Sequence, residues 1–147
     1  MEIRYILAPT DFSDASNQAV TYALGLAHAC GAKLSLLHVV EPLASPLNGY
    51  ISADLITTLL DDLEREAHMQ LAQLLSEAGA ANVEVTRHVV VGVPYEIILE
   101  TAKAQQVDLI AMVTRGRTGL SHLVLGSGAE RVVRLATCPV LTVRATA

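Results

Sequence analysis

Tryptophan is absent from this chain of 147 residues, and phenylalanine occurs only once. Ala, Val, Leu and Ile must therefore fill most of the core. The shortage of aromatic rings also removes the stacking platforms on which proteins bind single-stranded nucleic acid. Hydrophobic residues nevertheless make up 52% of the chain and charged residues 17%, a composition that favours a folded protein over a disordered one.

Positive charge is also scarce, because ten Lys and Arg stand against fifteen Asp and Glu, for a formal net charge of -5. A nucleic-acid binder needs a basic face to neutralise phosphates, so this balance argues against one. No apolar run approaches the roughly 20 residues that a membrane span requires, and the N-terminal MEIRYILAPTDFS lacks the basic region and cleavage site of a signal peptide. We therefore expect a cytoplasmic protein without membrane contact.

Cysteine is rare too, with Cys30 and Cys138 as the two thiols. They do not form a CxxC pair, and no nearby histidines complete a zinc pattern. Both stand in apolar sequence, which predicts that both thiols are buried in the core.

Short β-prone runs alternate with helical patterns along the whole chain. Strands are expected at residues 3–8, 33–40, 84–91, 109–113 and 140–143. Helices are expected from the Asp11–Asp14 region to Gly31, from Ser52 to Gly79, from Pro94 onward and from Gly126-Ser127 onward. This order favours an α/β fold, a doubly wound parallel sheet of five strands with helices on both faces, in one domain covering residues 1–147.

The second expected helix is the longest. Its apolar residues recur at helical spacing, the pattern of a helix that packs on a core. They are Leu55, Leu59, Leu63, Ala67, Leu71, Leu74 and Ala78.

Ligands of doubly wound sheets bind outside the carboxyl ends of the strands, where the strand order reverses. That rule selects residues 8–11, 39–41 and 114–127 as the candidate ligand segments. Candidate ligand residues at the strand ends are Pro9, Thr10, Asp11, Val39, Met112 and Val113.

The segment TRGRTGLSHLVLGSGAER, residues 114–131, contains four glycines and two closely spaced arginines. Glycine lets a backbone approach an anion closely. The N–H groups of Ser127, Gly128 and Ala129 would point outward at a helix start, where the helix dipole favours negative charge. The segment therefore suggests a phosphate cradle.

Side chains of this segment could strengthen such a cradle. Arg115 and Arg117 could donate charge-assisted hydrogen bonds, and the Ser127 hydroxyl could contact a phosphate oxygen. Spacing alone also fits a simpler interpretation, in which Gly116, Gly119 and Gly126 only shape a turn, the arginines are solvated and Ser127 is an ordinary helix cap.

Two strand-end residues have a similar pair of interpretations. Asp11 could accept a hydrogen bond from a ribose hydroxyl or an adenine amine, but an Asp before a helix is commonly a cap or the centre of an Asx turn. Val39 could bracket a base with its backbone, or it could belong to the core.

Six motifs, in this order along the chain, together resemble the universal stress protein family. They are APTDFS at 8–13, HVV at 38–40, DLI at 108–110, GRTGLS at 116–121, GS at 126–127 and CPVL at 138–141. The resemblance covers essentially the whole chain. It implies a flavodoxin-like sheet with strand order 3-2-1-4-5, similar to that of the adenine nucleotide α-hydrolases.

The resemblance also implies a homodimer formed by antiparallel pairing of the last strands. The residues of this interface would be Val140, Leu141, Thr142, Val143 and Arg144. Such pairing would cover an otherwise open sheet edge.

ATP-binding members of the family carry the pattern G-x2-G-x9-G-[ST], which Gly116, Gly126 and Ser127 match. Val113 stands where the first glycine belongs. If that position needs a positive φ or a very close approach to ribose, Val113 obstructs binding, whereas main-chain contact alone would tolerate it. The resemblance therefore implies a stress-response regulator that binds ATP, with Mg²⁺ on the phosphates, and whose contacts with a protein partner depend on nucleotide. The alternative is a nucleotide-free dimeric interaction module.

No pattern marks a catalytic group. The chain lacks a Walker loop and a supportable Ser-His-Asp arrangement. His122 lies in the ligand loop without a residue to orient it, and the other histidines form no metal-binding cluster in the sequence. A ligase or hydrolase of a related fold would need a second substrate pocket, which nothing in the sequence supplies. We expect slow ATP hydrolysis at most.

Overall fold

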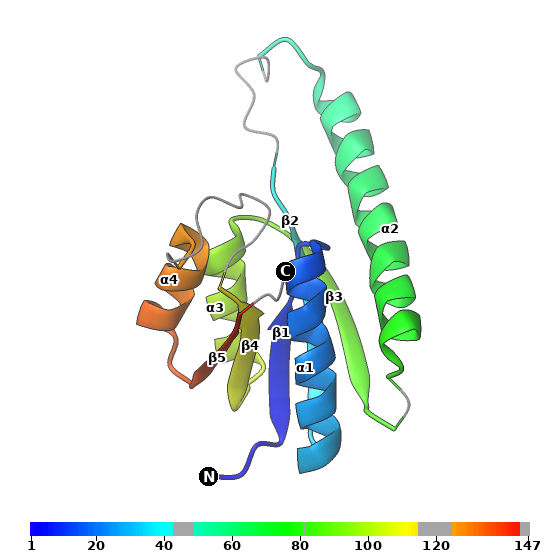
Figure 1. The fold of residues 1–147 in the computed structure, drawn as a ribbon. Coiled ribbons are helices and arrows are strands. Elements are labelled where there is room, and N and C mark those ends of the chain that lie inside the picture. Colours follow the sequence, from blue (N-terminus) through cyan, green and yellow to red (C-terminus); the bar gives the residue numbers. More distant parts are fainter. Residues whose placement is uncertain (43–48, 81, 115–124, 145–147) are drawn as a thin grey trace.

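The computed structural model describes residues 1–42, 49–80, 82–114 and 125–144, and Figure 1 shows their arrangement. The strands are β1 (Tyr5–Pro9), β2 (Lys33–Val40), β3 (Val85–Val91), β4 (Leu109–Val113) and β5 (Val140–Val143). The helices are α1 (Asp14–Cys30), α2 (Ala53–Ala78), α3 (Pro94–Ala104) and α4 (Ser127–Leu135).

The strands form one sheet in the order β3-β2-β1-β4-β5, and every neighbouring pair is parallel. The predicted fold class and strand order are thus confirmed. The first strand begins at Tyr5 rather than at residue 3 and includes Pro9, and the third begins at Val85 rather than at residue 84.

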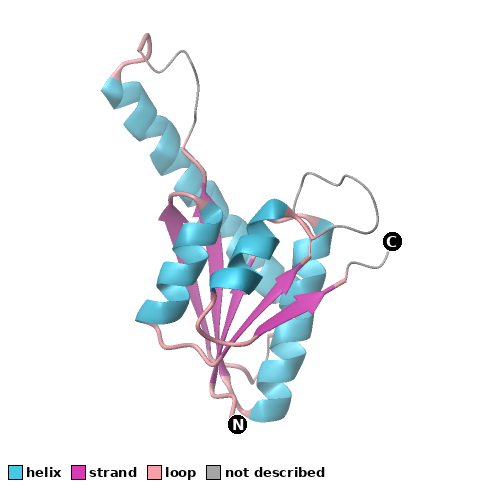
Figure 2. Cartoon of the chain, turned by 90° about the vertical axis from the view of Figure 1, so that its left-hand side faces the viewer, coloured by secondary structure: helices cyan, strands magenta, loops and turns pink. Residues whose placement is uncertain are grey.

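Helices cover both faces of the sheet, α1 and α2 on one and α3 and α4 on the other (Figure 2). Each face has its own apolar cluster. Along β1, Ile6 and Ala8 belong to the cluster under α1 and α2, whereas Leu7 belongs to the cluster under α3 and α4. Because both faces of the strands are covered, their sequences are nearly continuous in apolar residues instead of alternating.

The helix ends follow the local sequence. Ser13 caps α1 by accepting a hydrogen bond from the Ser16 N–H, and Ser52 caps α2 in the same way. Gly31 and Gly79 end these helices in the left-handed conformation, with φ of 66° and 68°. The predicted start and stop residues of both helices are therefore confirmed.

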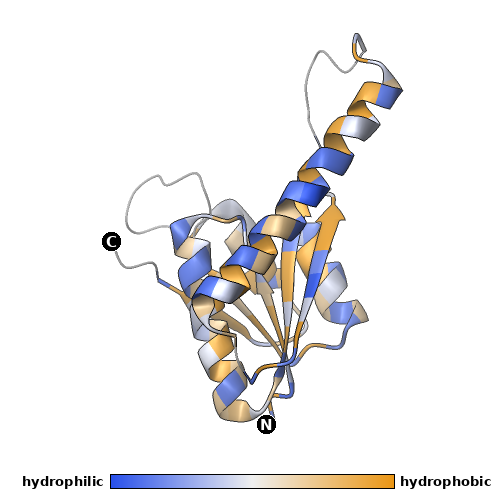
Figure 3. Ribbon diagram, turned by 90° about the vertical axis from the view of Figure 1, so that its right-hand side faces the viewer, coloured by the Kyte–Doolittle hydropathy of each residue, from blue (hydrophilic) through white to orange (hydrophobic). Residues whose placement is uncertain are grey.

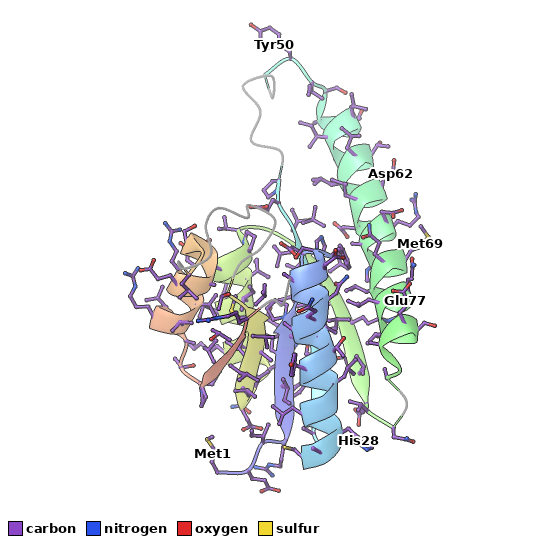
Figure 4. The ribbon with its side chains drawn as sticks, in the orientation of Figure 1. Met1, His28, Tyr50, Asp62, Met69 and Glu77 are labelled. Carbon is purple, nitrogen blue, oxygen red and sulfur yellow. The ribbon has the colours of Figure 1, made fainter. Side chains whose placement is uncertain are left out.

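The apolar stripe of α2 packs on the sheet along only part of its length. Ala67, Leu71 and Leu74 are buried in its C-terminal half. The N-terminal half extends past the strand ends (Figures 1 and 3), and Tyr50 lies beyond its tip (Figure 4). The three leucines of the stripe in this half are exposed, namely Leu55 at 50%, Leu59 at 38% and Leu63 at 43%. Periodicity predicted the apolar side of the helix, but it could not show where the sheet ends.

The two thiols differ in their surroundings. Cys30 is exposed, which contradicts the predicted burial, because it is the last residue of α1 and lies beyond the last buried position, Ala27. Cys138 is half-buried against the α3–α4 cluster. Burial raises the pKa of the Cys138 thiol above its ordinary value.

Over the described ranges, no helix is both long enough and apolar enough to cross a membrane.

A carboxylate joins the amino ends of β1 and β4. Asp108 Oδ2 accepts hydrogen bonds from the backbone N–H groups of Arg4 and Tyr5, each at 2.9 Å. The Asp108 N–H in turn donates to the Tyr5 carbonyl at 2.8 Å. One side chain thus satisfies two donors where the chain enters the central strand.

Replacing Asp108 with Ala should lower the free energy of unfolding by about 2 kcal/mol, because two backbone donors lose a charged acceptor at a partly exposed site. Asp108→Asn, which keeps an acceptor oxygen, should lose about half as much. Urea unfolding measures both, with Asp61→Ala on exposed α2 as the control. An Asp108→Ala variant as stable as the control would contradict this role.

Candidate functional site

A cleft of about 650 Å³ lies at the carboxyl ends of β1, β2 and β4. Its volume falls within the range of about 300–1,000 Å³ of small-molecule sites. All described residues of the predicted site line it: Pro9, Thr10, Asp11, Val39, Met112, Val113, Gly126, Ser127, Gly128 and Ala129. The remaining predicted site residues, Arg115, Gly116 and Arg117, lie outside the described residues.

The cleft also has walls that the sequence analysis did not assign. They include Phe12 and His38 near the strand ends, Glu66 and Gln70 of α2, and Tyr95 and Arg131 of α3 and α4. No motif marks the helical wall residues, because their positions depend on how each helix sits over the sheet. A usable signal existed only for Arg131, which stands four residues after Ser127 and so lies on the same helix face.

The Asp11 carboxylate is held by the first turn of α1. Its Oδ1 accepts hydrogen bonds from the Ser13 N–H at 3.0 Å, from the Ser16 hydroxyl at 2.8 Å and from the Ser13 hydroxyl. The bond to the Ser13 N–H is that of an Asx turn, one of the two roles that the sequence allowed. The turn therefore orients the carboxylate where it borders the cleft.

Thr10 ties the tip of β1 to its neighbours. Its N–H donates to the Leu37 carbonyl of β2 at 2.8 Å. Its buried hydroxyl donates to Asn17 Oδ1 at 3.2 Å, accepts from the Phe12 N–H at 3.0 Å and lies 3.0 Å from the Ser16 hydroxyl. The floor of the cleft is consequently a connected polar network and not a loose loop.

Phe12 has a backbone conformation that is unusual for a bulky residue, with φ of 64°. Such a conformation costs on the order of 1–3 kcal/mol and persists only where the surroundings hold it. The Phe12 ring stacks on His38, with 4.3 Å between ring centroids. His38 Nδ1 lies 2.8 Å from the Thr10 carbonyl, and because a carbonyl only accepts, Nδ1 is the protonated nitrogen.

Val113 is a regular strand residue. It lies in β4, is 6% exposed, and packs with Ala19 of α1 and Val143 of β5. Val113 does not have a positive φ, since the described non-glycine residues that do are Phe12, Asn82 and Gln106. A β-branched side chain suits this extended backbone.

The start of α4 differs from the starts of α1 and α2. Gly126 is the N-cap residue, and no side chain of the described chain caps the helix there. The Gly126 N–H donates to the Thr114 carbonyl at 2.9 Å, which brings together the two ends of the intervening segment. Ser127 is the first helical residue and not the cap, so its interpretation as an ordinary N-cap was wrong.

Charge is distributed unevenly around the cleft. Asp11, Glu41 and Glu66 are the acidic residues among the described lining, and Arg131 is its one Arg or Lys. Glu66 belongs to α2 and Arg131 to α4, which lie on opposite sides of the strand ends (Figure 1). A ligand with one anionic end would therefore be oriented with that end toward α4.

Among the described side chains, no group of three or more His, Cys, Asp or Glu is placed to hold a metal ion.

Residues 2–144 match the model of the universal stress protein family. The chain is 38% identical over 142 residues to universal stress protein MJ0531 of Methanocaldococcus jannaschii, covering 95% of this chain and 81% of that protein.

Two solved structures extend the comparison. The fold is similar to that of MJ0577 of the same organism, with a TM-score of 0.86 and 28% identity over 100% of this chain and 99% of that one. It is also similar to a universal stress protein in complex with cAMP, with a TM-score of 0.73 and 25% identity over 99% of this chain and 100% of that one. With a family match over nearly its whole length, this chain belongs to the universal stress protein family.

Proposed function

We propose that this protein binds an adenine nucleotide in the cleft, with ATP as its ligand, and acts as a nucleotide-dependent homodimeric regulator in a stress response. The observation that carries the proposal is the position of the uncapped start of α4, which lines the same cleft as the ends of β1 and β2. The similar structure in complex with cAMP supports an adenine nucleotide as the class of ligand.

The phosphates are assigned to the start of α4. The first N–H groups of a helix have no intrahelical acceptor, and the helix dipole favours an anion there. Gly126 places no side chain over these donors, and the Ser127 hydroxyl adds another donor. The predicted contacts of Arg115 and Arg117 belong to the same end. Mg²⁺ would be held mainly by the phosphates, as is common for nucleotide-bound magnesium.

The nucleoside is assigned to the ends of β1 and β2. The Asp11 carboxylate would accept from a ribose hydroxyl, and the Asx turn that holds it reduces the entropy lost on binding. Pro9 and Thr10 would line the ribose side together with Met112 and Val113, and the backbone of Val39 would contact the base. The acidic α2 wall would keep the phosphates at the other end.

Calorimetric titration with MgATP should show one site per chain. Ser127→Ala should weaken binding about 5-fold, the effect of losing one hydrogen bond of about 1 kcal/mol. Ser52→Ala is the matched control, since it makes the same chemical change at the N-cap of α2, and Ser52 is not among the residues that line the cleft. The control should lower stability by about 1 kcal/mol and leave affinity unchanged.

No heat at high protein concentration, together with no nucleotide in the purified protein, would defeat the proposal. That result would favour the nucleotide-free interaction module instead. If the Ser127 and Ser52 variants lost the same amount of affinity for MgATP, the assignment of the phosphates to α4 would be wrong.

Val113 should not obstruct the nucleotide, because its backbone is extended and its side chain packs against Ala19 and Val143. Val113→Gly should therefore leave the affinity for MgATP within about 2-fold while lowering the free energy of unfolding by about 3 kcal/mol, through lost burial and added chain entropy. Titration and urea unfolding measure the two effects. A large gain in affinity would show that Val113 had closed the ribose side.

The dimer is assigned to β5, which is paired only with β4 and forms one edge of the sheet. Leu141 is 39% exposed on this strand. It borders a groove of about 570 Å³ formed with α1 residues, including Tyr22 and Leu26. An open strand beside apolar surface is a suitable place for a second copy of the chain.

The ladder to β4 shows which groups of β5 face the open edge. The Pro139 carbonyl accepts from the Ile110 N–H of β4 at 3.0 Å, and the Val143 carbonyl accepts from the N–H of Thr114, directly after β4, at 3.2 Å. Because successive residues of a strand direct their backbone groups to opposite edges, Val140 and Thr142 present theirs away from β4. These are the groups that an antiparallel partner strand would use.

Thr142→Pro should weaken the dimer, since it removes an outward N–H without removing a β4–β5 hydrogen bond. Two such losses per symmetric dimer, at about 1 kcal/mol each, predict a dissociation constant roughly 30-fold higher. Thr142→Ala keeps the N–H and serves as the control. Light scattering across a dilution series measures both, and equal dimerisation of the two variants would place the interface elsewhere.

A further inference from the structure

We propose that Arg131 binds the outer phosphates of the nucleotide, and that the Tyr95 ring holds Arg131 in position to do so. The site would then prefer ATP over AMP. This inference rests on the nucleotide binding proposed above, and it concerns two residues that the ATP-binding motif does not include.

Arg131 lies on the cleft side of α4. It follows Ser127 by four residues, so the two share a helix face, and both line the cleft. Helical side chains lean toward the N-terminus and cover the preceding turn. This general lean would carry the guanidinium of Arg131 toward the turn that begins at Ser127, where the phosphates are assigned.

The Tyr95 ring restricts this guanidinium. The Cζ atom of Arg131 lies 4.7 Å from the centroid of the ring, a cation–π distance. Tyr95 is the second residue of α3, and its hydroxyl donates to Glu96 Oε1 at 2.9 Å. The contact therefore links the start of α3 to the middle of α4, through two residues that line the cleft, and it limits the rotamers of a long side chain.

The guanidinium has no acidic partner among the described residues. The neighbouring Arg134 pairs with Glu130 at 3.9 Å, but no described carboxylate lies within 4.0 Å of Arg131. A planar guanidinium matches a phosphate with two parallel donors, which a ring-stacked position leaves available at its edge.

The charges around the cleft indicate which phosphates Arg131 would reach. Glu66 belongs to α2 and Arg131 to α4, and these helices lie on opposite sides of the strand ends (Figure 1), so a nucleotide bound along the cleft would have its base toward α2. The phosphate nearest the ribose meets the α4 amides first. The β- and γ-phosphates lie farther from the base, on the side of Arg131.

The test compares MgATP, AMP and adenosine by calorimetric titration against the full chain and two Arg131 variants. Arg131→Gln should weaken MgATP about 10-fold, the effect of losing a charge-assisted hydrogen bond, and should change AMP and adenosine by less than about 2-fold. Arg131→Lys should recover only part of the loss, because an ammonium group lacks the planar fork.

The Tyr95 variants test whether the aromatic ring positions Arg131, by comparing a substitution that removes the ring with one that keeps it. Tyr95→Leu should weaken MgATP about 3-fold, the scale of an exposed cation–π contact, whereas Tyr95→Phe keeps the ring and should bind as the unmodified chain does. Arg134→Gln is the matched control, since it removes the same charge from the same helix outside the cleft lining and should leave every affinity unchanged.

The outcomes separate this inference from the proposed function. Binding of MgATP with an unchanged ratio of ATP to AMP affinity in Arg131→Gln overturns the role of Arg131 and leaves nucleotide binding intact. If Arg134→Gln loses as much affinity for MgATP as Arg131→Gln, the effect comes from net charge alone, and the role of Arg131 is overturned. No binding of any of the three ligands to the unmodified chain overturns both proposals.

Discussion

Parallel pairing of the strands is the constraint on which the rest of this structure depends. Each of the first four strands is followed by a helix that returns the chain to the amino ends of the strands, so the carboxyl ends of β1, β2 and β4 lie together. The helices α1, α3 and α4 begin at this carboxyl end of the sheet. Backbone donors at a helix start have no intrahelical acceptors. The topology therefore gathers polar backbone around the cleft, and side chains decide how much of it is satisfied.

The three helix starts differ in how their first backbone N–H groups are satisfied. At α1, Ser13 accepts from a backbone N–H of the first turn and also donates to Asp11. The start of α3 also has no side-chain cap, but its N-cap is Val93 and its first residue is Pro94, which has no N–H to offer an anion. At α4 the chain places Gly126, with no described side chain over the helix start. A helix dipole alone would make all three ends similar, so the difference in side chains is what localises an anion to α4 under the proposed function.

Apolar periodicity and helix-end residues are local signals, and they were sufficient for the alternation of strands and helices and for the segments that meet at the cleft. The strand order was implied by the family resemblance. The sequence was insufficient for features that depend on how the helices and strands lie relative to one another. The stripe from Leu55 to Leu63 has the period of a packed helix, yet it extends past the sheet. The glycine pattern raised the question whether position 113 needs a positive φ, and only the structure shows that its backbone is extended. The contact of Tyr95 with Arg131 joins two helices whose relative position no local pattern records.

An acidic protein that binds an anionic ligand must do so through local groups. The formal net charge of -5 gives no long-range attraction for a nucleotide, and at physiological salt surface charges are screened over about 8 Å. Inside a cleft the screening is weaker, so a few oriented donors outweigh the distant charges. Under the proposed function, Asp11 and Glu66 would act as orienting groups, since they would repel phosphates from one end while α4 and Arg131 would attract them at the other. The unfavourable net charge would thus lower the rate of encounter, whereas the local charges of the cleft would orient the bound nucleotide.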